Sequence, residues 1–160
     1  GMKYDDNRCI NSIKSKRCIA VRGNHDDDIC AALDYRKISP DNVQFLADLP
    51  DQLLAEEKYF LLHAPSNRRI VSVEEATEEF PKLPKSAEIS FFGHSHQQAV
   101  FCKDATGCTE QKSTTKSTIY LRPGNKYMIN PGGVGLYWGQ QKTYLIYDDQ
   151  TRLLHLRKLL

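Results

Sequence analysis

Four of the five histidines in this sequence share one kind of setting. Each follows a short apolar run and has glycine or proline nearby, and the four are His25, His63, His94 and His96. Imidazole is a frequent ligand of transition metals and a frequent acid–base group near neutral pH. In open α/β sheets, ligands bind just beyond the carboxyl ends of strands, where these side chains would lie. The pattern therefore predicts a site of metal or acid–base chemistry.

Asn24, directly before His25, adds an amide oxygen to this set. Asn24, His63, His94 and His96 together would form a mixed nitrogen and oxygen site. Such a site suits Mn, Fe, Zn or Ni better than Mg or Ca, which prefer shells made only of oxygen. His155 differs from the others because it lies inside the apolar run 153–156 with no turn residue beside it. We interpret it as a structural strand residue.

The elements that must position these residues alternate between helix and strand at first and are mainly strands later. Helices are predicted over residues 7–16, 29–33 and 73–80, and from Ser39-Pro40 to just before Pro50. Strands are predicted over residues 18–21, 58–63, 89–92, 99–102, 118–121, 127–129, 143–147 and 153–156, with an exposed hairpin loop over 103–118. This order predicts a single α/β domain over residues 1–160.

Composition narrows the function classes. The chain has 160 residues with 22 basic and 20 acidic side chains, so its net charge of +2 gives no electrostatic reason to bind nucleic acid. No apolar run approaches the roughly 20 residues of a membrane span. The five cysteines form no Cys-x-x-Cys pair, which disfavours a zinc-structured nucleic-acid binder. These features predict reduced thiols and a cytoplasmic protein with neither a membrane nor a nucleic acid as partner.

At the histidines the sequence resembles the calcineurin-like metallophosphoesterases, most closely the small bacterial and archaeal phosphodiesterases of that superfamily. The matching motifs follow the family's order: Gly23-Asn24-His25-Asp26, His63-Ala64-Pro65, Gly93-His94-Ser95-His96 and Asn130-Pro131-Gly132-Gly133. The resemblance implies a four-layer α/β/β/α sandwich of two mixed sheets, with the site at one edge. It also implies a hydrolase that cleaves a small phosphodiester or phosphomonoester with metal-activated water.

The resemblance assigns a role to each matching residue. Asn24, His63 and His94 correspond to ligands of the family's second metal, and His96 to a ligand of its first. His25 corresponds to the catalytic histidine that protonates the leaving oxygen, and Asp26 would orient it, as carboxylates commonly orient imidazoles. The family site holds two divalent metal ions, in line with the general two-metal pattern.

Two earlier motifs of the family, an Asp-x-His and a Gly-Asp pair, do not occur in this sequence. The resemblance therefore implies that an N-terminal strand–helix–strand of roughly 40 residues is missing, about the size of a βαβ unit. Without the bridging aspartate we expect one metal ion or none, and impaired phosphoesterase activity. Loss of a strand pair would expose a sheet edge, which predicts a homodimer. The alternative is a non-catalytic remnant that folds, dimerises and binds metal or phosphate.

Overall fold

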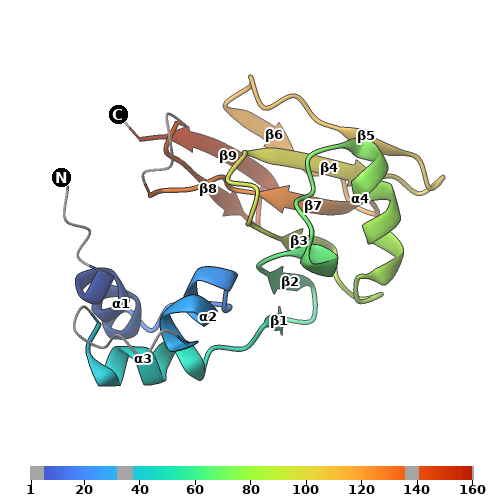
Figure 1. Cartoon of the computed structure of the whole chain (residues 1–160). Helices are drawn as coiled ribbons and strands as arrows, with labels where there is room; N and C mark the ends of the chain where they lie inside the picture. The colour runs from blue at the N-terminus through green and yellow to red at the C-terminus, as the bar shows by residue number, and fades with distance from the viewer. Residues whose placement is uncertain (1–5, 32–37, 136–140, 160) are drawn as a thin grey trace. The chain divides into compact units, whose positions relative to one another are not determined.

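The computed structural model describes residues 6–31, 38–135 and 141–159. Two compact units make up the chain, residues 1–53 and residues 54–160, called here unit 1 and unit 2. Figure 1 labels the elements of both units. The prediction of one domain over residues 1–160 concerns the whole chain and stays a prediction.

Unit 1 is built mainly from three helices, α1 (Asp6–Ser15), α2 (Asn24–Ala31) and α3 (Pro40–Ala47). Their buried contacts come from Ile10, Ile38 and Leu46. The Asn7 side-chain oxygen accepts hydrogen bonds from the Ser39 amide and the Asn42 side chain, at 2.9 and 3.0 Å. These bonds fasten α1 to the start of α3. The helices predicted over 7–16 and from Ser39-Pro40 are confirmed, and that over 29–33 overlaps the end of α2, with residues 32–33 outside the described residues.

The strand predicted over residues 18–21 is wrong. These residues have no regular structure, and Ile19 is 63% exposed. A strand requires a partner for its backbone hydrogen bonds. Before residue 52, the described part of unit 1 contains only helices and their connections, so this run has no strand to pair with. In consequence Asn24 does not follow a strand but is the first residue of α2.

Unit 2 contains two sheets, with strand orders β1-β2-β3-β7-β4-β5 and β6-β9-β8. β3 is parallel to both β2 and β7, whereas β4 is antiparallel to both β7 and β5. The smaller sheet is antiparallel throughout. β1 contains the boundary between the units. The strands are β1 (Gln52–Ala55), β2 (Tyr59–Leu62), β3 (Ile89–Phe91), β4 (Ala99–Lys103), β5 (Thr109–Gln111), β6 (Thr118–Tyr120), β7 (Lys126–Asn130), β8 (Thr143–Asp148) and β9 (Leu153–Lys158).

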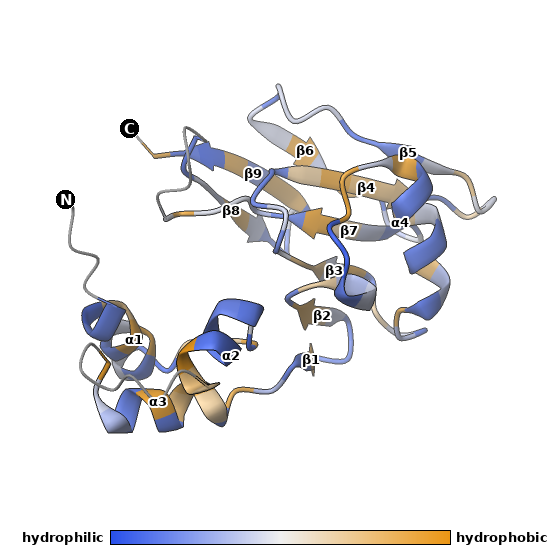
Figure 2. Ribbon diagram, viewed as in Figure 1, coloured by the Kyte–Doolittle hydropathy of each residue, from blue (hydrophilic) through white to orange (hydrophobic). Residues whose placement is uncertain are grey.

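The central strands β4 and β7 of the large sheet are buried on both faces. Successive side chains of a strand point to opposite sides, so each of these strands contributes to two cores. On one face, Val100 of β4 and Ile129 of β7 pack with Leu121, Leu154 and other residues at the smaller sheet. On the other face, residues of β4 and β7 pack with the chain around helix α4 (Val73–Glu79); this cluster is Ile70, Ala76, Phe80, Phe92, Ala99, Phe101 and Met128. Figure 1 shows α4 against this sheet, and Figure 2 shows the hydrophobic segments of β7 and β9.

The α/β fold with two packed sheets is confirmed, and so are all the predicted strands apart from the one over 18–21. The smaller sheet is antiparallel instead of mixed in the residues described. Two short strands were missed, β1 and β5, the second within the region interpreted as a loop. Helix α4 begins with a capping box between Ser72 and Glu75, and the 3-10 helix Phe80–Lys82 follows its end.

Candidate functional site

His63 and His94 lie side by side beyond the ends of two neighbouring parallel strands. β2 ends at Leu62 and β3 at Phe91. The Gly93 amide donates to the His63 carbonyl at 2.9 Å, which continues the pairing past both strand ends. The Nε2 atom of His63 is 3.1 Å from Nδ1 of His94, and the ring centroids are 5.0 Å apart. The sheet thus brings together two of the residues predicted to hold a metal.

The spacing of these two nitrogens is compatible with a shared metal ion. Two nitrogens each about 2.1 Å from one ion are about 3.0 Å apart at a right angle and about 3.4 Å apart at the tetrahedral angle. The observed 3.1 Å lies between these values. Within residues 6–31, 38–135 and 141–159, no group of three or more His, Cys, Asp or Glu side chains could hold a metal ion. The pair therefore fits part of a coordination shell, and the ligand roles of Asn24 and His96 stay predictions.

The backbone is strained at both histidines of the Gly93–His96 loop. His94 and His96 have φ values of 67° and 58°, in the left-handed region that residues with a side chain rarely adopt. The Ser95 amide donates to the Gly93 carbonyl at 2.8 Å, which makes the turn tight. Each left-handed residue costs about 1 kcal/mol or more. Strain of this kind concentrates at functional sites, where the surrounding structure enforces it.

Asn130 supports this loop, although the sequence analysis did not include it among the site residues. It ends β7, and it is fully buried. Its Nδ2 donates to the Gly93 carbonyl at 2.8 Å and to the Ser95 hydroxyl oxygen at 3.0 Å. Its Oδ1 accepts from the Gly132 amide at 2.9 Å. The available signal was the Asn-Pro-Gly motif, which places an amide directly after an apolar run.

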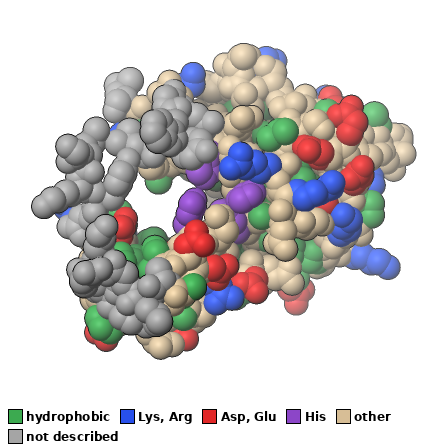
Figure 3. Space-filling model, viewed as in Figure 1, with side chains coloured by type: hydrophobic (Ala, Val, Ile, Leu, Met, Phe, Trp, Pro, Cys, Tyr) green, Lys and Arg blue, Asp and Glu red, His purple; other side chains and the backbone are tan. Residues whose placement is uncertain are grey.

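A polar pocket of about 410 Å³ lies beside His96. Its lining combines one imidazole, one ammonium, amides and hydroxyls, with no carboxylate among the residues that line it, which are His96, Gln97, Gln98, Thr114, Thr115, Gln141, Thr143 and Lys158. A lining rich in hydrogen-bond donors suits a polar or anionic group. On the face shown in Figure 3, acidic and basic side chains of the described residues are intermixed.

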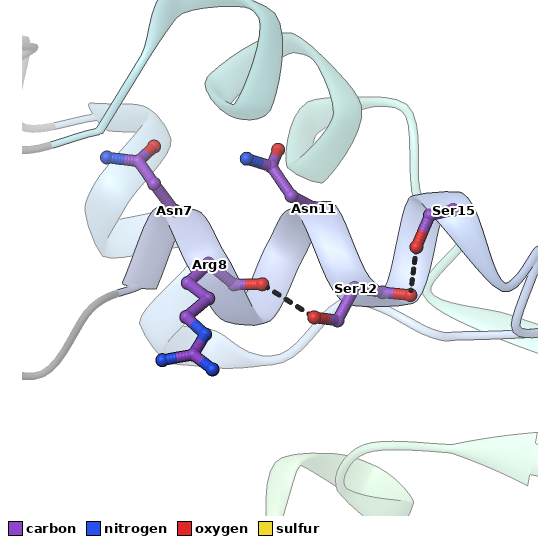
Figure 4. A pocket seen from close by; sticks show the side chains of 5 residues that line it. All are labelled: Asn7, Arg8, Asn11, Ser12 and Ser15. Atoms are coloured by element: carbon purple, nitrogen blue, oxygen red, sulfur yellow. Dashed lines mark hydrogen bonds between the residues drawn. The ribbon is translucent and has the colours of Figure 1, made fainter.

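A second hollow, of about 500 Å³, lies along α1. Figure 4 shows its five lining side chains on this one helix, Asn7, Arg8, Asn11, Ser12 and Ser15. The Ser12 hydroxyl donates to the Arg8 carbonyl and the Ser15 hydroxyl to the Ser12 carbonyl, at 2.9 and 3.1 Å. Both hydroxyls thus bond to their own helix. We interpret this hollow as the polar side of α1.

Asn24, His25 and Asp26 form the first turn of α2 in unit 1. The Gly23 amide donates to the Asp26 carboxylate at 2.8 Å, so Asp26 satisfies a backbone group at the helix start. Nδ1 of His25 lies 3.4 Å from the Asp28 carboxylate, and 78% of the His25 side chain is exposed. This contact of His25 is with Asp28, and the orienting role of Asp26 stays a prediction. His63, His94 and His96 belong to unit 2.

Glu79, on α4, anchors the loop that follows His63. Its side chain is 2% exposed, and its carboxylate accepts hydrogen bonds from Ser66 at 2.8 Å, Arg68 at 3.0 Å and Lys82 at 2.8 Å. Ser66 has a φ of 47°, so this loop also contains a left-handed residue. Burial by itself would raise the pKa of Glu79, but the hydrogen bonds from Lys82, Ser66 and Arg68 outweigh it and lower this pKa.

Replacing Glu79 by glutamine is expected to lower the free energy of unfolding by about 1–3 kcal/mol at pH 7, since hydrogen bonds to a charged group are lost. Because the pKa of Glu79 is lowered in the folded chain, its contribution is complete above the unfolded value of about 4.3 and is lost as the pH falls through the folded value. Denaturant titrations between pH 3 and pH 7 should therefore show the two proteins converging in acid.

The matched control is Glu78→Gln. Glu78 also contacts Arg68, at 2.9 Å, but 64% of its side chain is exposed. Exposed ion pairs contribute little, so this variant should unfold like the wild type. If both variants lose the same free energy of unfolding, the burial of Glu79 does not make its hydrogen bonds more stabilising.

Comparisons with known proteins support the resemblance of the motifs. A family model described as "Calcineurin-like phosphoesterase superfamily domain" matches residues 5–152, parts of both units. An uncharacterized protein of Methanocaldococcus jannaschii is 25% identical over 170 residues, covering 94% of this chain and 68% of its own length. The crystal structure of a metallophosphoesterase from Sphaerobacter thermophilus matches with a TM-score of 0.79 at 19% identity, over 96% of this chain and 71% of that one. This structural likeness shows the fold. Among the described residues, no helix is long and apolar enough to cross a membrane.

Proposed function

This chain belongs to the calcineurin-like phosphoesterase superfamily, and from that premise we propose that it is a metal-dependent hydrolase of a small phosphate ester. The observation that carries the proposal is the pair of imidazoles at the ends of β2 and β3, with 3.1 Å between their ring nitrogens. In this structure the two ring nitrogens lie within hydrogen-bonding distance of each other, and imidazole nitrogens at this spacing are well suited to bind a borderline metal ion. The left-handed backbone at His94 further supports a site under functional constraint.

The chain's own groups would divide the work in hydrolysis. His63 and His94 would hold a divalent ion, with Asn24 and His96 as the further ligands proposed. Such an ion, when bound, neutralises phosphate oxygens and lowers the pKa of a water molecule. His25 would donate a proton from its ring to the leaving oxygen, a role that suits an exposed imidazole. The polar pocket beside His96 offers donors to the rest of the substrate.

The test is hydrolysis of an aryl phosphodiester by the full chain, with Mn²⁺ added after treatment with a chelator. We expect turnover that requires Mn²⁺ and that falls by about 10²- to 10⁴-fold in His25→Ala, the usual contribution of a general acid. Mn²⁺ affinity, measured by calorimetry, should be nearly equal in the two proteins, since His25 is proposed to act on a proton.

Two other outcomes would contradict parts of this proposal. Turnover that survives in His25→Ala would remove the acid role from His25. Folded protein that binds Mn²⁺ or phosphate without any turnover would favour the alternative, a non-catalytic binding protein. We propose Mn, Fe, Zn or Ni ahead of Mg, because imidazole nitrogens suit these metals better, and competition titrations would rank them.

A further inference from the structure

The buried side chain of Asn130, at the end of β7, makes hydrogen bonds to loop residues. A buried amide must find partners for its donors and its acceptor, or it destabilises the fold. Asn130 finds them in two loops and in none of its neighbouring strands. Its Nδ2 bonds to the Gly93 carbonyl and the Ser95 hydroxyl oxygen, and its Oδ1 bonds to the Gly132 amide. The two donor bonds reach the residues on either side of His94.

These bonds hold a conformation that the loop would not keep by itself. His94 and His96 both lie in the left-handed region, which residues with a side chain rarely adopt. A loop with this strain relaxes unless other contacts enforce it. The hydrogen bonds from Asn130 to the Gly93 carbonyl and the Ser95 hydroxyl supply such contacts on both sides of His94. The side-chain amide of Asn130 therefore stabilises the backbone conformation that orients both imidazole rings.

Asn130 is itself fixed from the other side. The Thr143 hydroxyl donates to the Pro131 carbonyl at 2.8 Å, and the Thr143 amide donates to the Gly133 carbonyl at 2.8 Å. The segment after Asn130 is thus bound to the start of β8. This arrangement leaves the Asn130 side chain little freedom to follow a moving loop, so it can impose a position on the Gly93–His96 loop.

A comparison with Asn42 separates this role from general packing. Asn42 is 1% exposed and bonds to Asn7 and Lys14, so it joins helices of unit 1. Asn130 is equally buried, but both its donor bonds end at the loop that carries two histidines of the candidate site. Burial requires that each amide has partners, and only for Asn130 do those partners lie beside proposed metal ligands.

We propose that Asn130 is a positioning residue that fixes His94 and His96 through the Gly93 carbonyl and the Ser95 hydroxyl. The effect of Asn130 on metal binding rests on the proposed function, whereas its effect on the geometry of the two imidazoles does not. In this role the first residue of the Asn-Pro-Gly motif orients the histidines of the candidate site. Outer partners of metal ligands typically change affinity by 10- to 100-fold when they are removed.

The test compares Asn130→Ala with Tyr127→Phe in the full chain. Tyr127 lies on the same strand, is 1% exposed, and its hydroxyl accepts a hydrogen bond from the Arg122 amide at 2.7 Å. The control thus loses a buried polar contact of β7 without touching the Gly93–His96 loop. Circular dichroism establishes that each variant is folded, and thermal melting gives the stability that each one loses. Ser95→Ala removes the hydroxyl that accepts from Asn130 and, with it, the longer bond from the Gln97 amide at 3.4 Å. It leaves the bond from Asn130 to the Gly93 carbonyl and should have a smaller effect than Asn130→Ala.

The decisive readout without metal is the nuclear Overhauser contact between the rings of His63 and His94. We expect this contact to be lost or weakened severalfold in Asn130→Ala and unchanged in Tyr127→Phe. Retention of the contact in folded Asn130→Ala would overturn the proposal. Failure of the wild type to bind any metal would overturn the proposed function instead, and the ring contact would still decide the role of Asn130.

The second readout is the affinity for Mn²⁺ alone, by calorimetry. We expect a 10- to 100-fold weaker affinity in Asn130→Ala, an intermediate loss in Ser95→Ala, and less than a twofold change in Tyr127→Phe. A loss of Mn²⁺ affinity that follows the melting temperature equally in Asn130→Ala and Tyr127→Phe would show a structural role only, and would also overturn the proposal.

Discussion

Replacing His94 by alanine is expected to abolish the Mn²⁺-dependent hydrolysis of an aryl phosphodiester and to weaken Mn²⁺ binding by at least about 100-fold. The His94 ring is one of the two imidazoles in contact beyond the ends of β2 and β3. Removing an outer partner of a ligand costs 10- to 100-fold in metal affinity, and removing a ligand itself should cost at least as much. Calorimetry with Mn²⁺ and initial rates of hydrolysis measure the two effects separately.

A second substitution separates loss of the imidazole from relaxation of the strained loop. His94→Asn keeps a residue that tolerates the left-handed conformation, so it should leave the backbone in place and still lose turnover. The matched control is His155→Ala, which removes an imidazole that contacts Thr118 in the smaller sheet, at 3.2 Å. This control should keep both activity and Mn²⁺ affinity. If His94→Ala keeps wild-type Mn²⁺ affinity, His94 is not a ligand.

Replacing Gly132 by alanine is expected to lower the free energy of unfolding by about 2–5 kcal/mol. Two effects add at this position. Gly132 has a φ of +79°, which costs a residue with a side chain about 1–2 kcal/mol. A Cβ atom there would also lie 1.9 Å from the Thr143 hydroxyl oxygen, so buried atoms must shift, at a typical cost of about 1–3 kcal/mol. Chemical denaturation measures the sum.

Gly124→Ala isolates the first of these effects. Gly124 has a φ of +81°, but no atom lies within 4 Å of the position a Cβ would take. Only the backbone cost should remain, so this variant should lose about 1–2 kcal/mol. Combining Gly132→Ala with Thr143→Ala should restore part of the lost free energy of unfolding, because the hydroxyl that obstructs the Cβ atom is gone. A loss in Gly132→Ala no greater than in Gly124→Ala would show that the contact with Thr143 relaxes without cost.

Much of unit 2 could be predicted from the sequence because its central strands, β4 and β7, are buried on both faces. Val100 and Phe101 are adjacent and both fully buried, so the run that contains them stands out from its surroundings. The convergence of His63 and His94 could also be inferred, since both follow such runs and the carboxyl ends of parallel strands meet at one sheet edge. A run of apolar residues was therefore enough to predict a strand wherever the strand is buried.

The errors occurred where pairing, and not hydrophobicity, decides the structure. Ile19 lies in an apolar run, but among the residues of unit 1 that the structure describes no strand pairs with it, so the run stays irregular and Ile19 is exposed. The strand β5 (Thr109–Gln111) is polar and forms because β4 lies beside it. The bonds from Asn130 join segments that are 37 and 35 residues apart in sequence. Contacts of this range follow from the complete fold, which local spacing does not encode.

The strand order also fixes when the candidate site can be completed. β3 lies between β2 and β7, and the chain from 92 to 125 separates β3 from β7. Closing a long loop lowers the entropy of the chain before any stabilising contact forms, so pairings between distant segments form slowly. The ribosome synthesises the chain from the N-terminus to the C-terminus, so His63 and His94 emerge well before Asn130. During synthesis the two histidines therefore exist for a time without the strand that holds their loop, and the geometry of the site is acquired only when β7 has been added.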